Sequence, residues 1–342
     1  MSGLSQNRVV FRNRHDSVQS EHLRSCIVFL LMLTMSTKLS PSTIILLTIP
    51  PILWACNAII GRLIAPMIPP VTLNFLRWVI AFIVLLPMAW SIFRAGSGVW
   101  LHKTQYAMLG LLGIGLYNAL QYLALKSSSP INVTLVASGM PIWMMLVGAS
   151  FFGAALQTKQ ILGAILSMLG VLLVLSRGEL KHLLELHLVP GDLLMILATI
   201  AWSFYSWLLA GKSKLGEVSQ QWAHFLLAQI SYGLVWSGLF AAAEWQHAQQ
   251  HIDWSLQLIG AIIFVAIGPA IIAFRCWGAG VQRAGANIAG FFVNLTPLFT
   301  AVLSSLILQE APHTYHAIAF LLIVGGIIVS SFQRQAPATD HL

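Results

Sequence analysis

Charged residues are scarce in this chain: they make up 8% of its 342 residues, whereas a soluble domain carries about 25%. So few charges cannot cover the surface of a 37.4 kDa protein in water, which excludes an ordinary cytosolic enzyme and a disordered protein. The net charge of +8 does not indicate nucleic-acid binding, because the basic residues lie in short separate segments and not on one face.

Cysteine and the common catalytic motifs are also scarce. The three cysteines, Cys26, Cys56 and Cys276, are too far apart for a disulfide framework or a metal site. The sequence contains no GxxxxGK[ST] loop, no HExxH, no GxSxG and no pair of aspartates within an apolar segment. These absences disfavour an ATP-driven pump and a membrane-embedded enzyme, and we expect no cofactor and no metal.

Long apolar stretches recur along the chain, in which 58% of the residues are hydrophobic. They form runs and do not alternate, which favours transmembrane helices over a membrane barrel. The sequence therefore predicts an all-α polytopic membrane protein with ten transmembrane helices. The expected spans are about 42–64, 71–93, 104–125, 131–153, 158–176, 191–210, 219–243, 255–276, 286–308 and 314–333.

Lysine and arginine predict the orientation of these spans. With the N-terminus in the cytoplasm, the inside segments hold thirteen of these residues and the outside segments four, which favours both termini in the cytoplasm. Glu244 and Asp253 then fall in an outside loop. We expect a multi-pass protein of the plasma membrane, which in bacteria is the inner membrane.

The first 41 residues form a basic, polar segment with one apolar run that is too short to span a bilayer. We interpret residues 1–41 as a cytoplasmic tail. An alternative is an artefact of start-site assignment, since Met35 would be a natural beginning, so residues 1–34 could be missing from the mature protein. Residues 334–342 are expected to form a cytoplasmic C-terminal tail.

The longest polar interruption between spans divides them into two groups of five. Because five is odd, the second group enters the membrane from the opposite side, so two halves of one fold would be inverted repeats. The expected halves are residues 42–176 and 191–333, joined by a loop over 177–190. An offset of 156 residues pairs Pro141 with Pro297 and Gly170 with Gly326.

Several short stretches carry a resemblance to a known family. They are Trp54-Ala55-Cys56-Asn57, Leu76-Arg77-Trp78, Ala124-Leu125-Lys126-Ser127 and Gln309-Glu310-Ala311. Together with ten spans in two halves, they make the chain similar to the EamA-type branch of the drug/metabolite transporter superfamily over about residues 42–333. The resemblance implies an exporter. In one departure from the family, Ala154 occupies the position that corresponds to Glu310 in the other half.

Polar residues recur at helical spacing within four spans and predict the lining of a central cavity. Amide and hydroxyl groups beside aromatic walls suit small amphipathic solutes, such as amino acids or drug-like molecules. The alternative is that these side chains only bond neighbouring helices together. The candidate substrate-binding residues of these spans are Trp54, Asn57, Asn118, Gln121, Tyr122, Trp202, Tyr205 and Asn294.

Arg77 lies about six positions into the second span, where a charge costs about 2.5 kcal/mol or more to insert. Its guanidinium could hold a carboxylate or phosphate of the substrate through two parallel hydrogen bonds. Alternatively, the side chain could extend to the outer membrane interface or bind backbone carbonyls.

The remaining candidates concern motion and coupling. Pro141 and Pro297 each remove a backbone hydrogen bond and predict kinks, which could be gating hinges or static. No carboxylate is expected within a span, so we favour facilitated diffusion, or proton coupling through His224 or Glu310. Gly163 and Ser167 lie four residues apart in the fifth span and would permit close helix packing.

These features together predict a secondary transporter that exports small metabolites by alternating access. Its partners would be the lipid bilayer, a small-molecule substrate and, as a further option, a second copy in a homodimer. A membrane channel or receptor subunit is the alternative, with a membrane enzyme less favoured.

Overall fold

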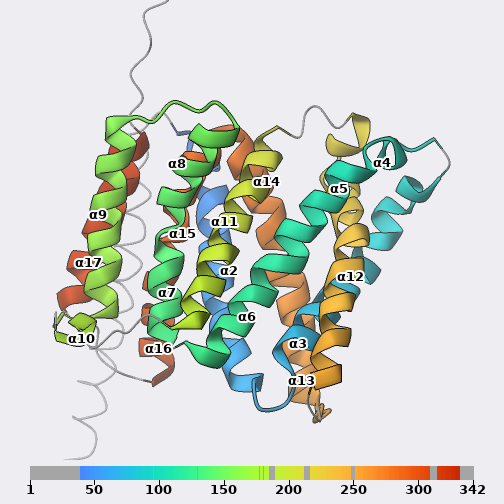
Figure 1. Cartoon of the computed structure of the whole chain (residues 1–342), viewed down its shortest axis with the longest axis horizontal. Coiled ribbons are helices and arrows are strands. Elements are labelled where there is room, and N and C mark those ends of the chain that lie inside the picture. The colour runs from blue at the N-terminus through green and yellow to red at the C-terminus, as the bar shows by residue number, and fades with distance from the viewer. Residues whose placement is uncertain are drawn as a thin grey trace, which may run out of the picture.

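The protein is a bundle of helices that cross it side by side (Figure 1). The computed structural model describes residues 39–94, 96–128, 130–176, 178–179, 181–184, 189–211, 216–247, 251–308 and 314–331. Within these ranges it contains no strand, and nine helices are long and apolar enough to span a membrane. The all-α membrane fold expected from the sequence is confirmed.

Five crossings form the first half. They are α2 (Pro41–Ile64); α3 (Pro70–Ala89) with the 3₁₀ turn η1 (Trp90–Phe93); α5 (Lys103–Leu109), η2 (Gly110–Leu116) and α6 (Tyr117–Ser127); α7 (Pro130–Ser138) with α8 (Met140–Phe151); and α9 (Thr158–Leu175). The short helix α4 (Gly98–Leu101) precedes the third crossing. The nine long helices do not include the fourth crossing, because α8 alone is too short to span a bilayer. Helices α7 and α8 together form this crossing, which brings the number in the described residues to ten.

Five crossings form the second half. They are α11 (Pro190–Ala210); α12 (Trp222–His247); α13 (Leu256–Val265), η5 (Ala266–Ile272) and α14 (Ala273–Ala284); α15 (Ala286–Val293) with α16 (Leu295–Leu308); and α17 (Thr314–Ser331). Short helices α10 (Lys181–Leu184) and η4 (Glu217–Ser219) lie in connections. The eighth crossing runs unbroken from Leu256 to Ala284, so the expected end at residue 276 is wrong.

Irregular backbone recurs at the same place in both halves. The third crossing contains a π-helical segment from Gly110, and the eighth contains one from Ala266, 156 residues later. Helices α9 and α17, which begin at Thr158 and Thr314, have the same separation. The offset that pairs the two prolines therefore also pairs backbone features, which supports the interpretation of the halves as repeats.

The fourth and ninth crossings are each interrupted next to a proline. The fourth breaks at Gly139, whose N–H donates to the carbonyl of Val136, and the ninth breaks at Asn294, whose N–H donates to Phe291. The breaks lie just before Pro141 and Pro297, which lack the N–H that would continue the helical hydrogen bonds. The predicted interruptions are therefore present, and a hinge movement stays a prediction.

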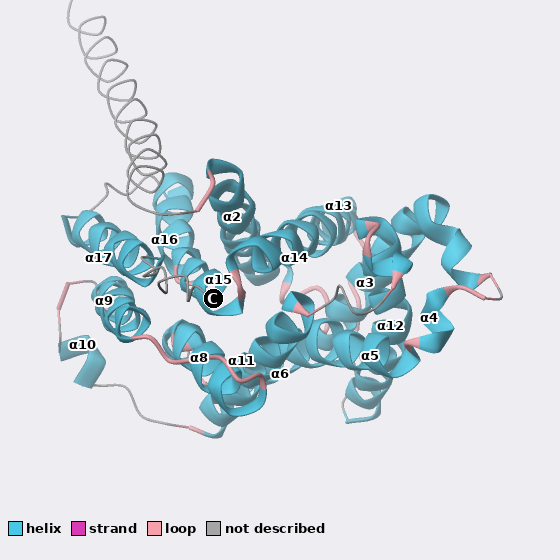
Figure 2. Ribbon diagram, turned by 90° about the horizontal axis from the view of Figure 1, so that it is seen from above, coloured by secondary structure: helices cyan, strands magenta, loops and turns pink. Residues whose placement is uncertain are grey.

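Contacts between helices follow the same two-fold pattern (Figures 1 and 2). Helix α9 packs along α17, and α3 packs along α12, so like helices of the two halves meet at the ends of the bundle. In the middle, α2 packs on α14, and α11 packs in the equivalent way on α6. The centre of the molecule is thus built by the first and third helices of both halves.

The contact of α9 with α17 depends on small residues. A Cβ atom on Gly326 would lie 2.6 Å from the carbonyl oxygen of Gly163 and 2.9 Å from Cβ of Ser167. The two backbones therefore touch where Gly163 and Ser167 face α17, and the predicted role of this pair in close packing is confirmed.

The first turn of α3 is capped by a carboxylate from α12. The buried side chain of Glu244 accepts hydrogen bonds from the N–H groups of Val71 (3.2 Å) and Thr72 (2.8 Å) and from the hydroxyl of Thr72 (2.9 Å). Carboxylates bind well here because a helix N-terminus carries free N–H groups and partial positive charge. Since α12 continues to His247, the expectation that Glu244 lies in a loop is wrong.

Replacing Glu244 by alanine is expected to destabilise the protein by about 1–3 kcal/mol, because it leaves buried donors of α3 without partners. The measurement is the thermal unfolding midpoint of the purified protein in detergent. Asp253→Ala is the control, since that carboxylate is exposed and pairs with His251, which is also exposed. Equal midpoints for the two variants would contradict the capping role.

Candidate functional site

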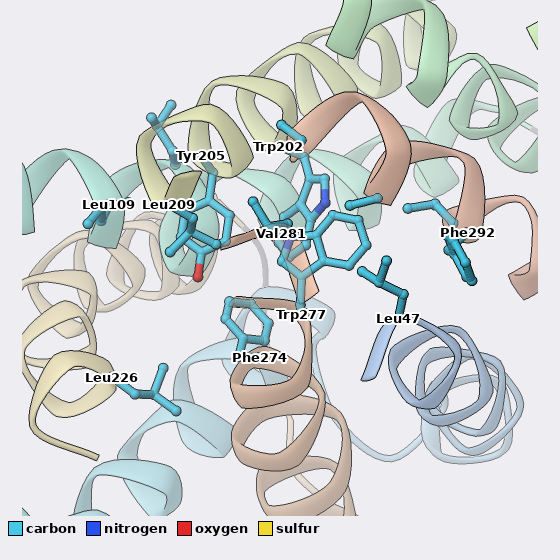
Figure 3. Close-up of a cluster of buried hydrophobic side chains, with 14 of the residues drawn as sticks. Leu47, Leu109, Trp202, Tyr205, Leu209, Leu226, Phe274, Trp277, Val281 and Phe292 are labelled. Carbon is cyan, nitrogen blue, oxygen red and sulfur yellow. The ribbon is translucent and has the colours of Figure 1, made fainter. Parts of the chain in front are cut away.

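An aromatic cluster lies where the central helices of the two halves meet. Trp202 of α11 is at its middle, with ring centroids of Tyr117 at 4.9 Å, Trp54 at 5.4 Å and Phe274 at 5.4 Å. Trp277 lies 5.7 Å from it. Figure 3 shows Trp202 and Trp277 next to each other, with Phe274 close by. Because these residues come from α2, α6, α11 and α14, both halves build the cluster.

Polar groups fix the orientation of two of these rings. The indole N–H of Trp277 donates to the hydroxyl of Ser206 at 3.2 Å. The hydroxyl of Tyr205, whose ring lies 5.0 Å from that of Trp202, donates to the amide oxygen of Gln229 at 3.1 Å. These two bonds satisfy the polar atoms of the buried rings, as is usual for buried tyrosine and tryptophan.

Helix α6, which contributes Tyr117 to the cluster, also carries polar side chains. Asn118 is buried, and Gln121 and Tyr122 are partly buried. The offset of 156 residues pairs Asn118 with Phe274, Gln121 with Trp277 and Tyr122 with Gly278. At these three pairs of equivalent positions, the first half therefore has a side chain with a polar group where the second half has an aromatic ring or a glycine.

Gly278 borders unfilled space. It is a buried residue of α14, yet a Cβ atom added to it would meet no atom within 4 Å. Phe274 lies four residues earlier on the same face of this helix. Open space beside a buried residue that follows directly after Trp277 of the aromatic cluster gives room for part of a bound molecule.

Arg77 is 3% exposed, which does not fit the alternative in which it extends to the membrane interface. Its guanidinium carbon lies 5.2 Å from the ring centroid of Trp78. That ring contacts Phe274 of the aromatic cluster at 4.9 Å. The charge thus lies beside the cluster and inside the protein.

Comparison with known proteins identifies the family. The model of the EamA-like transporter family matches residues 25–176 and again residues 189–332. The chain belongs to the EamA-like transporter family. It is accordingly a multi-pass membrane transporter, and the resemblance drawn from its short motifs is confirmed.

Curated relatives of this EamA-like transporter are transporters by name. An uncharacterised transporter of Archaeoglobus fulgidus is 25% identical over 86% of this chain and 99% of its own length. The aromatic amino acid exporter YddG of Ancylobacter novellus is 27% identical over 70% of this chain and 78% of its own. A probable amino-acid metabolite efflux pump of Salmonella typhimurium is 22% identical over 82% and 92% of the respective chains.

A solved crystal structure shares the fold of this EamA-like transporter. It matches with a TM-score of 0.67 and covers 85% of this chain and 96% of its own, at 22% sequence identity. The likeness extends over the described bundle and supports its helix arrangement.

The structure brings only some of the expected site residues together. Trp54, Trp202 and Tyr205 belong to the aromatic cluster, and Asn57 follows one helical turn after Trp54 and is partly buried. Asn294 instead donates to the hydroxyl of Ser167 at 2.9 Å. For Asn294 the geometry therefore supports the alternative of bonding between helices.

Of the two residues considered for proton coupling, only His224 lies among the described residues. His224 of α12 shares a hydrogen bond of 2.8 Å with Ser91 in η1, which is how an interfacial histidine is typically held. Glu310 lies outside the described residues. A coupling role for either residue stays a prediction.

The sequence does not predict three rings of this EamA-like transporter's aromatic cluster: Tyr117, Phe274 and Trp277. Phe274 lies within the expected eighth span, whereas Trp277 lies just beyond its expected end at residue 276. The offset of 156 residues, which pairs Gln121 with Trp277, could have pointed to that ring.

Proposed function

We propose that this EamA-like transporter exports small amphipathic metabolites, amino acids first among them, across the plasma membrane by alternating access. The observation that carries the proposal is the aromatic cluster between the two halves, with unfilled space at Gly278. Aromatic faces suit the apolar part of such a solute. The side chains of Asn118, Gln121 and Tyr122 would bind its polar end.

The inverted halves support alternating access. A solute bound between them would become accessible from one side or the other as one half rocks against its partner. The breaks before Pro141 and Pro297 are positions where the backbone could absorb this change. The names of the Ancylobacter and Salmonella relatives, an exporter and an efflux pump, support the outward direction. In this proposal both termini lie in the cytoplasm.

Counterflow in proteoliposomes tests this function. Vesicles preloaded with unlabelled L-phenylalanine are expected to accumulate labelled L-phenylalanine transiently, and initial rates should saturate with concentration. Trp54→Ala is expected to lower the rate at least about tenfold, since a lost aromatic contact worth ~1.4 kcal/mol already gives that factor. Trp100→Ala is the matched control, because that indole is 55% exposed.

A channel would give a different result. Its flux would rise with concentration without saturation and would show no counterflow, which would contradict the carrier mechanism. Equal rates for the Trp54 and Trp100 variants would contradict the aromatic cluster as the binding site.

A further inference from the structure

Arg77 is a buried cation for which the described part of the chain supplies no counter-ion. Its Nε atom is fully buried and has no hydrogen-bond partner. Two ion pairs among the described residues, Lys181 with Glu179 and His251 with Asp253, are exposed and do not involve Arg77. An isolated charge held away from water is costly, and proteins normally pair it.

The groups around Arg77 do not replace a counter-ion. The Trp78 ring lies 5.2 Å from the guanidinium carbon, but a cation–π contact contributes only about 2 kcal/mol when desolvated. The phenol of Tyr122 lies within electrostatic range. Glu244 of α12 lies at the N-terminal end of α3, but both of its carboxylate oxygens accept hydrogen bonds from the first turn of α3.

A second polar side chain is incomplete at the same place. Asn74 precedes Arg77 by three residues and so lies on the same face of α3. Its amide nitrogen donates to the carbonyl oxygen of Ile114, in the π-helical segment η2, at 3.2 Å. Its own oxygen is buried and has no partner. The free atom of Asn74 is an acceptor, which would suit the ammonium group of a zwitterionic amino acid, whereas the donors of Arg77 suit an anion.

The geometry points to Arg77 as the binding site for an oxyanion, the carboxylate of the transported solute. A guanidinium binds a carboxylate through two parallel hydrogen bonds. The apolar part of the solute would lie on Phe274, whose ring is 4.9 Å from that of Trp78 and 5.4 Å from that of Trp202. This inference rests on the proposed function and narrows its substrates to carboxylates with an apolar body, zwitterionic amino acids included.

Ligand-induced thermal stabilisation of the purified protein in detergent tests the site without requiring transport. Phenylacetate and L-phenylalanine are expected to raise the melting temperature of the parent. Phenylacetamide, a neutral analogue of similar size, and 2-phenylethylamine, which lacks the carboxylate, should not. In Arg77→Gln the affinity for phenylacetate should fall at least about thirtyfold, as expected when one partner of a buried charge pair is removed.

Two further variants separate charge from structure. Arg77→Lys keeps the charge but lacks the planar fork, so it should bind phenylacetate at an affinity between those of the parent and Arg77→Gln. Arg62→Gln removes the same charge from an exposed position in the last turn of α2 and should bind like the parent. The melting temperature without ligand should not fall in Arg77→Gln, because loss of the contact with Trp78 is offset by removal of a buried charge that has no counter-ion.

The possible outcomes distinguish this site from the proposed function. Stabilisation by phenylacetate that depends on Arg77, without counterflow, would retain the site and contradict the transport proposal. Equal stabilisation by phenylacetate and phenylacetamide, or none by phenylacetate in the parent, would overturn the carboxylate site. Stabilisation that depends on Arg77 but comes only from phosphatidylglycerol would assign the anion to a lipid headgroup and overturn the solute assignment.

Discussion

Gly278→Leu is expected to abolish counterflow while the protein still folds. A Cβ atom at this buried position meets nothing within 4 Å, so a larger side chain can enter the space beside Phe274 without a clash at its first carbon. The leucine would then occupy the volume assigned to the solute. We expect transport to fall at least about tenfold, since overlap that costs ~1.4 kcal/mol of binding free energy gives this factor.

Gly260→Leu is the matched control for this experiment. It changes the same residue type in the same crossing of the membrane, but Gly260 is exposed and its added Cβ also meets nothing within 4 Å. Both variants should elute as single species and melt near the parent temperature. Normal counterflow by a folded Gly278→Leu protein would show that the solute does not use this space.

Gly326→Leu is expected to unfold the protein or prevent its accumulation in the membrane. The added Cβ would lie 2.6 Å from the backbone oxygen of Gly163, and a backbone oxygen cannot move without displacing α9. Overpacking of this kind costs about 3 kcal/mol at the upper end of the usual range, and here two helices must separate. The measurement is the yield of monodisperse protein and its thermal midpoint in detergent.

The neighbouring glycine provides the comparison. A Cβ on Gly325 meets nothing within 4 Å, so Gly325→Leu should accumulate and melt close to the parent. If Gly326→Leu were as stable as Gly325→Leu, the close contact of α9 with α17 would not stabilise the bundle.

The crossings and their interruptions could be predicted because they depend on local physics. Apolar runs of sufficient length must be helical in lipid, and Pro141 and Pro297 remove backbone donors wherever the chain goes next. The end of the eighth crossing was harder to place. Residues 277–284 contain Gly278, Gly280 and Arg283, which lower the local hydropathy, although the helix continues through them.

The site could be predicted only in part, because its residues come from distant segments. Trp54, Trp202 and Tyr205 stood out from their own helices, whereas the contact of Trp277 with Trp202 depends on how α14 packs against α11. Glu244 is expected in a loop because it follows the predicted end of the seventh span at residue 243, and its partners, Val71 and Thr72, lie over 170 positions earlier in the sequence. The spacing of residues within one helix contains no information about which other helix those residues will contact.

Under the proposed mechanism, the sequence differences between the halves also affect to which side of the membrane the empty transporter opens. Two halves of identical sequence would make the inward-open and outward-open forms equal in free energy, because the two-fold axis would exchange them. The halves differ at the equivalent positions Tyr122 and Gly278, and at Gln121 and Trp277. These differences remove the equality of the two free energies. Under the alternating access proposed above, each mismatched pair would therefore favour one of the two forms of the empty carrier, and exchanging such a pair between the halves would favour the other.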